Sequence, residues 1–366
     1  MNREELLRRL ESVQPGVSPK EILEQSDCIV FQNGEAFTFN DEVACRVTTG
    51  LSNKIEGAVK SKPLMELLRK LNDDEIEVDQ DEEGKIHFSG KGRRASFLVE
   101  KDVCLPIDVV EKPSSWKKLP GDFCEAAMVI SRCTGNDTAR IILSYVHVHS
   151  EYMEACQASS IFARWNLKTP VDKPILIKGE SLRHVASLGV TQFSETSQWM
   201  HFKTSFGLVL SCRLYLEEYP DLSHYLELKG KSVSLPSSLV DEADRASVFS
   251  NETPDENRVL VKLTNGKVSL ESVGINGSYF SRKKVEWEGD DVSFLVSPTV
   301  LTDVLRRQRK VVISDDKMIV DSGSYRLVAC LLKKSKTSTE PKTEKKPKGE
   351  TKEKGKEWNR DDEIPF

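Results

Sequence analysis

The chain lacks the features that mark a secreted or membrane-spanning protein. Among its 366 residues, no uninterrupted apolar run approaches the roughly 20 residues that a helix needs to cross a bilayer. The charged start, Met1-Asn2-Arg3-Glu4-Glu5, has no apolar stretch behind it, so no secretory signal is visible. The eight cysteines stand singly without a C-x-x-C pair, which favours reduced thiols packed as small apolar groups in a cytosolic protein. They are Cys28, Cys45, Cys104, Cys124, Cys133, Cys156, Cys212 and Cys330.

Enzyme signatures are also missing. No G-x-S-x-G, Walker loop or dinucleotide fingerprint occurs. His147 and His149 share one face of an expected strand, but no third ligand lies at a known metal-site spacing. The acidic run at residues 73–75 fits a solvated loop better than a metal site. An enzyme is one alternative class, and these absences lead us to expect no catalysis, no metal and no cofactor.

Charge is divided unevenly along the chain. From Lys333 onward, 11 basic and 8 acidic residues give +3, whereas the 332 residues before it hold 42 basic and 50 acidic groups and carry −8. Such a body is a poor candidate for nucleic-acid binding over its whole surface, but a local basic face remains possible. Residues 335–357 contain no aliphatic or aromatic side chain, so we expect disorder there. Apolar residues return at 358–366, which is the arrangement of a tethered peptide ligand.

Two helix patterns each occur three times in the body, at offsets of 116 to 119 residues. Each pattern puts a narrow apolar stripe on one helix face and leaves the opposite face polar. The first consists of Leu6, Leu10 and Val13, then Phe123, Ala127 and Ile130, then Leu239, Ala243 and Ala246. The second consists of Val59, Leu64 and Leu67, then Ile177, Leu182 and Val185, then Val296, Leu301 and Val304.

Strand-like stretches separate these helices. We expect strands at residues 28–31, 141–143, 199–202 and 259–263, and hairpin turns at 264–267 and 81–85. The chain is therefore predicted to be an α+β protein with three repeated domains, each with two helices packed on antiparallel sheets. Because exposed strand edges must be paired or covered, we expect sheets that continue across domain boundaries, with the last edges hidden by a second copy. The predicted segments are domains at 1–115, 116–229 and 230–333 and a disordered tail at 334–366.

Basic residues gather on the polar faces of the same helices and in one loop. Arg306 and Arg307 occupy the repeat positions of Arg69 and Lys70. Charged residues are common on any solvated helix face, so the repetition at equivalent positions is what favours a shared function. The full basic set is Arg3, Arg8, Arg9, Lys62, Arg69, Lys70, Lys91, Arg93, Arg94, Arg132, Lys178, Arg183, Arg245, Arg306, Arg307, Arg309 and Lys310, with His184 beside Arg183.

Three segments resemble the bacterial-type DNA polymerase sliding clamp, the β subunit of the replicative polymerase. Residues 245–252 read R-A-S-V-F-S-N-E, like the family's R-A-x-x-x-S-N-E. Residues 213–221 read R-L-Y-L-E-E-Y-P-D, like R-L-I-E-G-x-[FY]-P-D, and residues 61–71 resemble the clamp's second helix. The resemblance covers about residues 1–332 and is distant, as in divergent or virus-encoded copies.

The resemblance implies a head-to-tail homodimer, with six domains in a ring whose twelve helices surround duplex DNA. The basic set would then supply weak, sequence-independent phosphate contacts, while topology keeps the protein on DNA. Implied partners are double-stranded DNA, a second copy, a DNA polymerase and a clamp loader, in the cytoplasm of a bacterial or phage-infected cell.

The family's partner-peptide pocket is altered in this sequence. Its T-D-G-H-R-L stretch corresponds to residues 157–162, which read Q-A-S-S-I-F, and a pocket-wall proline corresponds to Glu227. The family's usual M-P-M-R-L ending is replaced by A-C-L-L-K, after which the chain continues. The resemblance places the pocket at Ile161, Phe162, Val328 and Leu331.

The C-terminus resembles a second family, because D-D-E-I-P-F is similar to the acidic tip of bacterial single-stranded DNA-binding proteins, D-D-D-I-P-F. In that family the terminal Phe and carboxylate enter a basic-rimmed apolar pocket on replication and repair proteins. The tip residues are Asp361, Asp362, Glu363, Ile364, Pro365 and Phe366.

A single-stranded DNA-binding protein, or one that modulates host replication through this tail, is the alternative. It would need base-stacking aromatics in an open basic groove, and aromatics make up only 7% of the chain. Trp116, Trp165, Trp199 and Trp287 do not group with basic runs.

Overall fold

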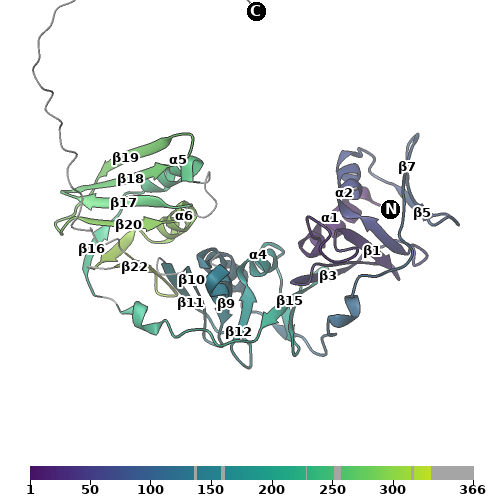
Figure 1. Cartoon of the computed structure of the whole chain (residues 1–366), viewed down its shortest axis with the longest axis horizontal. Coiled ribbons are helices and arrows are strands. Elements are labelled where there is room, and N and C mark those ends of the chain that lie inside the picture. Colours follow the sequence, from purple (N-terminus) through teal and green to yellow (C-terminus); the bar gives the residue numbers. More distant parts are fainter. Residues whose placement is uncertain (136–137, 158–160, 228, 251–256, 315–316, 331–366) are drawn as a thin grey trace, which may run out of the picture. The chain divides into compact units, whose positions relative to one another are not determined.

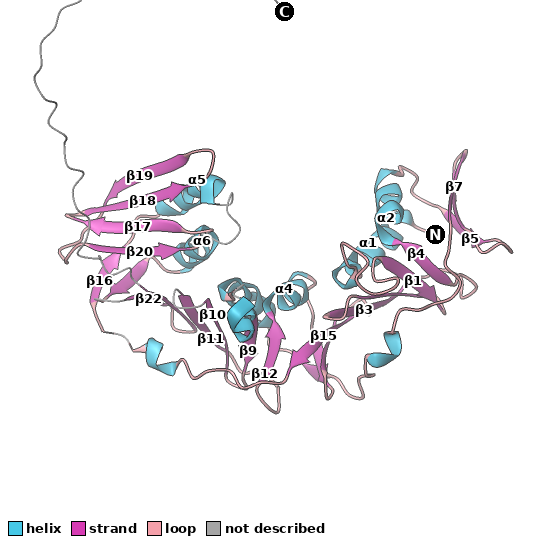
Figure 2. Cartoon of the chain, viewed as in Figure 1, coloured by secondary structure: helices cyan, strands magenta, loops and turns pink. Residues whose placement is uncertain are grey.

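The chain folds into alternating helices and antiparallel strands in a computed structural model, which describes residues 1–135, 138–157, 161–227, 229–250, 257–314 and 317–330 (Figures 1 and 2). This confirms the predicted α+β class. The longest helix in these ranges has 12 residues, so none of the described helices has the length to cross a bilayer.

Three blocks of elements follow one another in the same order, which is one helix, four strands, a second helix and three strands. The first block contains α1 (Arg3–Ser12), β1 (Cys28–Gln32), β2 (Glu35–Phe39), β3 (Val43–Thr48), β4 (Gly57–Lys60), α2 (Ser61–Lys70), β5 (Glu77–Gln80), β6 (Ile86–Gly90) and β7 (Arg93–Phe97). The repeat predicted from the helix patterns is therefore confirmed over the described residues.

The second and third blocks are each preceded by one short strand. The second consists of β8 (Lys117–Lys118), α3 (Phe123–Ile130), β9 (Tyr145–Val148), β10 (Tyr152–Gln157), β11 (Ile161–Asn166), β12 (Ile175–Lys178), α4 (Gly179–Ser187), β13 (Gln192–Glu195), β14 (Trp199–Lys203) and β15 (Val209–Tyr215). The third consists of β16 (Lys231–Ser234), α5 (Leu239–Ser250), β17 (Val259–Thr264), β18 (Lys267–Val273), β19 (Ser278–Lys284), β20 (Val292–Val296), α6 (Pro298–Arg307), β21 (Lys310–Ile313), β22 (Lys317–Asp321) and β23 (Tyr325–Cys330).

Sheets join the blocks, as the sequence predicts. Strand β15 of the second block pairs with β3 of the first, and β11 of the second block pairs with β23 of the third, both antiparallel. One sheet of 16 strands results, with the main order β16-β21-β22-β23-β11-β10-β9-β12-β15-β3-β2-β1-β4. The first block also has a separate sheet β5-β6-β7, and the third has β19-β18-β17-β20.

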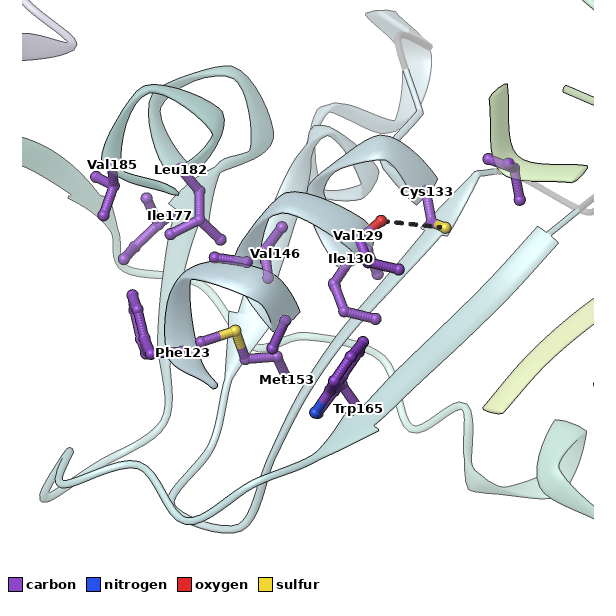
Figure 3. Close-up of a cluster of buried hydrophobic side chains, with 14 of the residues drawn as sticks. Phe123, Val129, Ile130, Cys133, Val146, Met153, Trp165, Ile177, Leu182 and Val185 are labelled. Carbon is purple, nitrogen blue, oxygen red and sulfur yellow. Dashed lines mark hydrogen bonds between the residues drawn. The ribbon is translucent and has the colours of Figure 1, made fainter. Parts of the chain in front are cut away.

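Each helix pair packs its apolar stripe against the strands of its own block. In the second block, Phe123 and Ile130 of α3 and Leu182 of α4 lie with Val146 and Met153 in one buried cluster (Figure 3). The helix stripes and the inward-facing side chains of the strands alternate with the periods of 3.6 and 2 that the sequence displays. Burial of these apolar surfaces is the main source of stability of each block.

Local signals set the ends of helices and hairpins. Helix α1 begins where the Asn2 side chain accepts a 2.9 Å hydrogen bond from the Glu5 backbone N–H. The predicted hairpin between β17 and β18 is confirmed, with Asn265 at φ 43° and Gly266 at φ 70°, the left-handed conformation that an Asn-Gly turn tolerates. The looser hairpin between β5 and β6 is also present.

The predicted strand at residues 141–143 is wrong. These residues lie in the 3-10 helix η4 (Thr138–Ser144), and β9 starts only at Tyr145. A run of three apolar residues has no periodicity that separates strand from helix, and here Leu143 packs with Phe162 and Val328. The other 3-10 helices are η1 (Gln14–Gly16), η2 (Ile107–Val109), η3 (Ser131–Cys133) and η5 (Ser223–Leu226).

Two smaller expectations also need correction. On α2, the buried residues are Leu64, Met65 and Leu68, while Leu67 is only half-buried, so the apolar stripe is rotated slightly from the predicted one. None of the eight cysteines, all of which are described residues, forms a disulfide, but Cys104 is exposed rather than packed in the core.

Candidate nucleic-acid interface

The second helices of the first and third blocks end in basic residues. Arg69 and Lys70 lie in the last turn of α2, and Arg306 and Arg307 lie in the last turn of α6, as the repeat predicts. Cations there are favoured by the helix dipole, which places partial negative charge at a C-terminus. This dipole effect explains part of the repetition without any ligand, so a role in binding has to rest on which charges are left unpaired.

Six members of the basic set are exposed, and their own side chains form no ion pair or hydrogen bond with any described residue. Because these cations are compensated only by solvent, they are the strongest candidates for phosphate contacts. They are Lys62 and Lys70 on α2, Lys91 in the turn between β6 and β7, Arg306 at the end of α6, and Arg309 and Lys310 just beyond it.

Arg8 lies on the exposed surface of α1. Its guanidinium carbon lies 5.7 Å from the ring centroid of Phe206, which is itself 36% exposed. No acidic side chain of the described residues pairs with it. Arg8 therefore keeps its charge available while its side chain is positioned by an aromatic ring.

Several other members of the basic set already form hydrogen bonds or ion pairs with residues of the first block. Arg3 is only 12% exposed and donates to the backbone carbonyls of Asp73 and Leu68, which ties α1 to the end of α2. Arg9 pairs with Glu5 at 2.6 Å, and Arg69 pairs with Glu11 at 3.0 Å. Arg93 and Arg94 lie at 3.7 and 3.6 Å from the carboxylates of Asp73 and Asp79, respectively.

Four members in the second and third blocks are also held by hydrogen bonds or ion pairs. Burial lowers the pKa of Arg183, which donates to the backbone carbonyl of Ser131. Arg245 pairs with Glu242 at 3.0 Å, Lys178 with Glu42 at 3.1 Å, and Arg307 with Glu125. The partners of Lys178 and Arg307 come from other blocks, and a sequence pattern within one helix cannot show them.

Four basic residues that were predicted to lie on helices lie outside the α-helices. Lys178 is the last residue of β12, Arg132 lies in η3, and Arg309 and Lys310 follow the end of α6 at Arg307, with Lys310 opening β21. Helix α6 ends early because the backbone of Gln308 is already extended, at φ −147° and ψ 122°. The basic cluster of the third block is thus a helix end plus the strand that follows it.

The carboxylate that organises α5 is not among the residues predicted from the sequence. Glu242 is 5% exposed and accepts hydrogen bonds from Tyr279 and from Arg245, and Lys283 lies at 3.1 Å. The hydrogen bond from Tyr279, followed by those from Ser281 and Lys283, holds the pKa of Glu242 down to about 2. The i, i+3 spacing of Glu242 and Arg245 is a usable signal, but Tyr279 and Lys283 become neighbours only through the packing of β19 on α5.

The residues predicted to form the partner-peptide pocket lie in the core. Ile161, Phe162 and Val328 are only 1 to 2% exposed, and Phe162 and Val328 pack in a cluster with Leu222, to which Tyr225 adds a partly buried ring. Leu331 and the tip residues 361–366 lie outside the described residues. The described part of this region therefore offers little surface to a peptide in the present conformation.

Nothing in the described residues indicates a metal site or a base-stacking groove. His147 Nδ1 donates a 2.8 Å hydrogen bond to the Glu154 carboxylate, and no group of three potential metal ligands occurs among the described side chains. Trp165 and Trp199 are 5% and 0% exposed, so bases cannot stack on them.

Comparisons with known proteins bear on the fold. No family model matches the chain, and no curated protein matches it. The solved DNA polymerase III subunit beta from Pseudomonas aeruginosa is 18% identical at a TM-score of 0.70, and the match covers 91% of this chain and 99% of that one. The DNA polymerase sliding clamp from Bacillus subtilis is 13% identical at a TM-score of 0.70, with 92% and 98% covered. The chain therefore has the fold of the bacterial DNA polymerase sliding clamps.

Proposed function

We propose that this protein is a DNA sliding clamp, a processivity factor that encircles duplex DNA and tethers a polymerase. The observation that carries the proposal is the match to solved clamps over nine-tenths of the chain, together with the order of elements that recurs in three blocks. In this proposal the blocks correspond to domains at residues 1–115, 116–229 and 230–333.

The strand pairings at the block junctions support closure by a second copy. Strands β3, β11 and β19 hold the same place in their blocks, as the third strand after the first helix, and β7, β15 and β23 are each the third strand after the second helix. The two junctions within the chain use β3 with β15 and β11 with β23. By the same rule, β19 would pair with β7, the two strands that form no junction within the chain. Two chains arranged head to tail would pair the β19 strand of each with the β7 strand of the other.

The unpaired cations fit a protein that holds DNA by topology. Six exposed basic side chains without partners, spread over α2, α6 and two adjacent segments, supply a modest and sequence-independent attraction to phosphates. A strongly basic surface would hold DNA tightly and slow sliding. The net negative charge of residues 1–332 instead limits DNA binding outside these six side chains.

The decisive experiment traps the protein on circular DNA. Protein is added to linear duplex so that rings thread over the ends, the duplex is ligated into circles, and retention is followed by gel filtration in about 0.5 M salt, where exposed ionic contacts are screened. We expect retention on circles and release after a single restriction cut. Equal retention on circles and cut DNA, or retention on neither, would contradict the proposal.

We further propose that the C-terminal tip recruits host replication or repair proteins, such as the clamp loader or others that bind single-stranded DNA-binding protein tails. The support is the sequence of the last six residues and the apolar-free stretch before them. Deletion of residues 364–366 should abolish pull-down of these proteins while leaving retention on DNA circles unchanged. Unchanged pull-down after the deletion would refute this role.

A further inference from the structure

Opposite charges join the blocks at both junctions within the chain. At the first junction, Lys178 of β12 pairs with Glu42 at 3.1 Å, and Arg213 of β15 donates to the backbone carbonyl of Asp41 at 2.7 Å and pairs with its carboxylate. At the second junction, Arg307 of α6 pairs with Glu125 of α3. Each strand pairing between blocks is therefore accompanied by a cation from one block and an anion from the other.

Strand β7 is an unpaired edge with exposed basic side chains. It pairs only with β6 among the described strands, and its Arg93 and Arg94 side chains are 56% and 57% exposed. The nearest carboxylates lie at 3.7 and 3.6 Å and belong to the same block, so they reduce the positive charge without removing it. Leu98, just beyond the strand, is 81% exposed and gives the edge an apolar end.

Strand β19 is an unpaired edge of the same character. Among the described strands it pairs only with β18, and its solvent-facing side chains include Arg282 and Lys284. Lys284 lies directly across from Lys267 of β18, so two cations already face each other there. Phe280 is 54% exposed, and the Arg282 guanidinium carbon lies 5.1 Å from its ring centroid. Like β7, this edge combines an exposed apolar residue with exposed basic side chains, and no described carboxylate pairs with Arg282 or Lys284.

We infer that the β7 and β19 edges repel each other, so that ring closure is weak at low ionic strength and is strengthened by salt. The inference rests on the proposed function, because it takes the partner of each edge to be the opposite edge of a second copy. Paired strands lie about 4.8 Å apart, well inside the Debye length of about 10 Å at 0.1 M salt. Like charges facing each other across strands oppose pairing, while the exposed apolar residues favour it.

This charge arrangement makes the ring reversible. Attraction between the two edges comes from the apolar contacts of Leu98 and Phe280 and from the backbone hydrogen bonds. Repulsion between the basic side chains offsets part of this attraction, and salt screening sets how large that part is. Basic side chains on both edges also prevent the strands from pairing with unrelated sheets, which is a known use of Lys and Arg at sheet edges. The ring would then open and close without unfolding of either block.

The experiment measures the mass of the full chain without DNA by sedimentation velocity. For the wild type, the dimer dissociation constant should fall about tenfold between roughly 50 and 500 mM sodium chloride, because screening removes the repulsion. Charge reversal of one edge, as R93E/R94E or as R282E/K284E, should tighten the dimer at low salt about tenfold or more and invert the salt dependence. Reversal of both edges in one chain should restore weak, salt-promoted association.

Mixing the two single-edge variants identifies the pairing itself. Each variant can dimerise with itself through opposite charges, whereas a mixed dimer would bring basic against basic at one interface and acidic against acidic at the other. We therefore expect two separate homodimers and no exchange when one variant is fluorescently labelled. If β7 instead paired with β7 and β19 with β19, the two variants would bring opposite charges together and would form mixed dimers, and this result would overturn the inference.

Controls separate charge at the edges from general effects. The variant K20E/K112E makes the same change in net charge at exposed lysines outside both strands and should leave the dissociation constant unchanged within twofold. Thermal unfolding verifies each variant's fold, and the neutral variant R93Q/R94Q should give an intermediate tightening if the reversal perturbs the strand. A dimer that weakens with salt, or one unaffected by edge charge, overturns the inference. Retention on DNA circles is scored separately, so its loss would count against the proposed function alone.

Discussion

Helices α5 and α6 pack side by side in the third block, yet they use their charges in opposite ways (Figure 1). On α5, Arg245 is drawn into the ion pair with Glu242, and the helix carries three acidic residues against this one cation. On α6 and the strand that follows, Arg306, Arg309 and Lys310 are exposed and unpaired by any described side chain. A basic residue on a helix face is thus available to a ligand only if its own fold does not already use its charge.

The largest effect is expected at the α5 carboxylate. Replacing Glu242 with Ala removes the acceptor shared by Tyr279, Lys283 and Arg245 and should lower the free energy of unfolding of the third block by about 2–3 kcal/mol. Urea denaturation measures the loss. Asp244→Ala, an exposed site on the same helix, should change stability by less than about 0.5 kcal/mol. Similar effects of both variants would mean that Glu242 does not organise this block.

Acid should remove the same contribution in the wild type. The pKa of Glu242 is about 2 in the folded protein and close to 4.5 when unfolded, so its stabilisation is complete above pH 4.5 and is lost as the pH falls towards 2. The difference in urea midpoint between wild type and Glu242→Gln should therefore shrink between pH 5 and pH 2.5. A difference that stays constant over this range would show that the lowered pKa is not the source of the stabilisation.

The α6 cluster should affect DNA binding and leave stability nearly unchanged. The triple variant R306A/R309A/K310A should weaken binding to a short linear duplex about tenfold and lower the slope of log affinity against log salt by about 2–3, since each phosphate contact contributes about 0.9. Fluorescence anisotropy over a salt series measures both. The control K20A/K54A/K112A removes three exposed lysines elsewhere and should leave the slope unchanged. Equal slopes for both variants would remove α6 from the proposed interface.

The sequence predicts what local patterns determine. The two repeated apolar patterns placed all six helices, because an amphipathic helix has to bury its apolar face wherever it lies. The Asn265-Gly266 turn was equally predictable, since its backbone conformation restricts the residue types. Even the joining of sheets between blocks followed from the need to pair strand edges.

Pairing of charges over long distances could not be predicted in this way. Glu125 lies 182 residues before Arg307, and Glu42 lies 136 residues before Lys178, so no window of sequence shows that these cations are occupied. The strand prediction for the apolar run before Tyr145 was wrong for a related reason. The side chains that surround this run come from Phe162 and from segments much later in the chain. The sequence therefore predicted the positions of the basic residues of the candidate site. Only the structure shows which of them already form ion pairs or hydrogen bonds within the fold.

The smallest effect tests this separation on α2, where Arg69 pairs with Glu11 while the neighbouring Lys70 is free. Both partners of the pair are about half exposed, so the pair contributes at most about 1 kcal/mol to stability. Glu11→Gln should release Arg69 and remove a negative charge beside it, which raises affinity for linear duplex about two- to threefold and steepens the salt slope by up to about 1. Glu4→Gln removes a more exposed negative charge on the same helix, beside the mostly buried Arg3, and as the control it should have less effect on the slope. If both variants raise affinity equally, the gain comes from net charge alone and pairing within the fold does not decide which cations reach DNA.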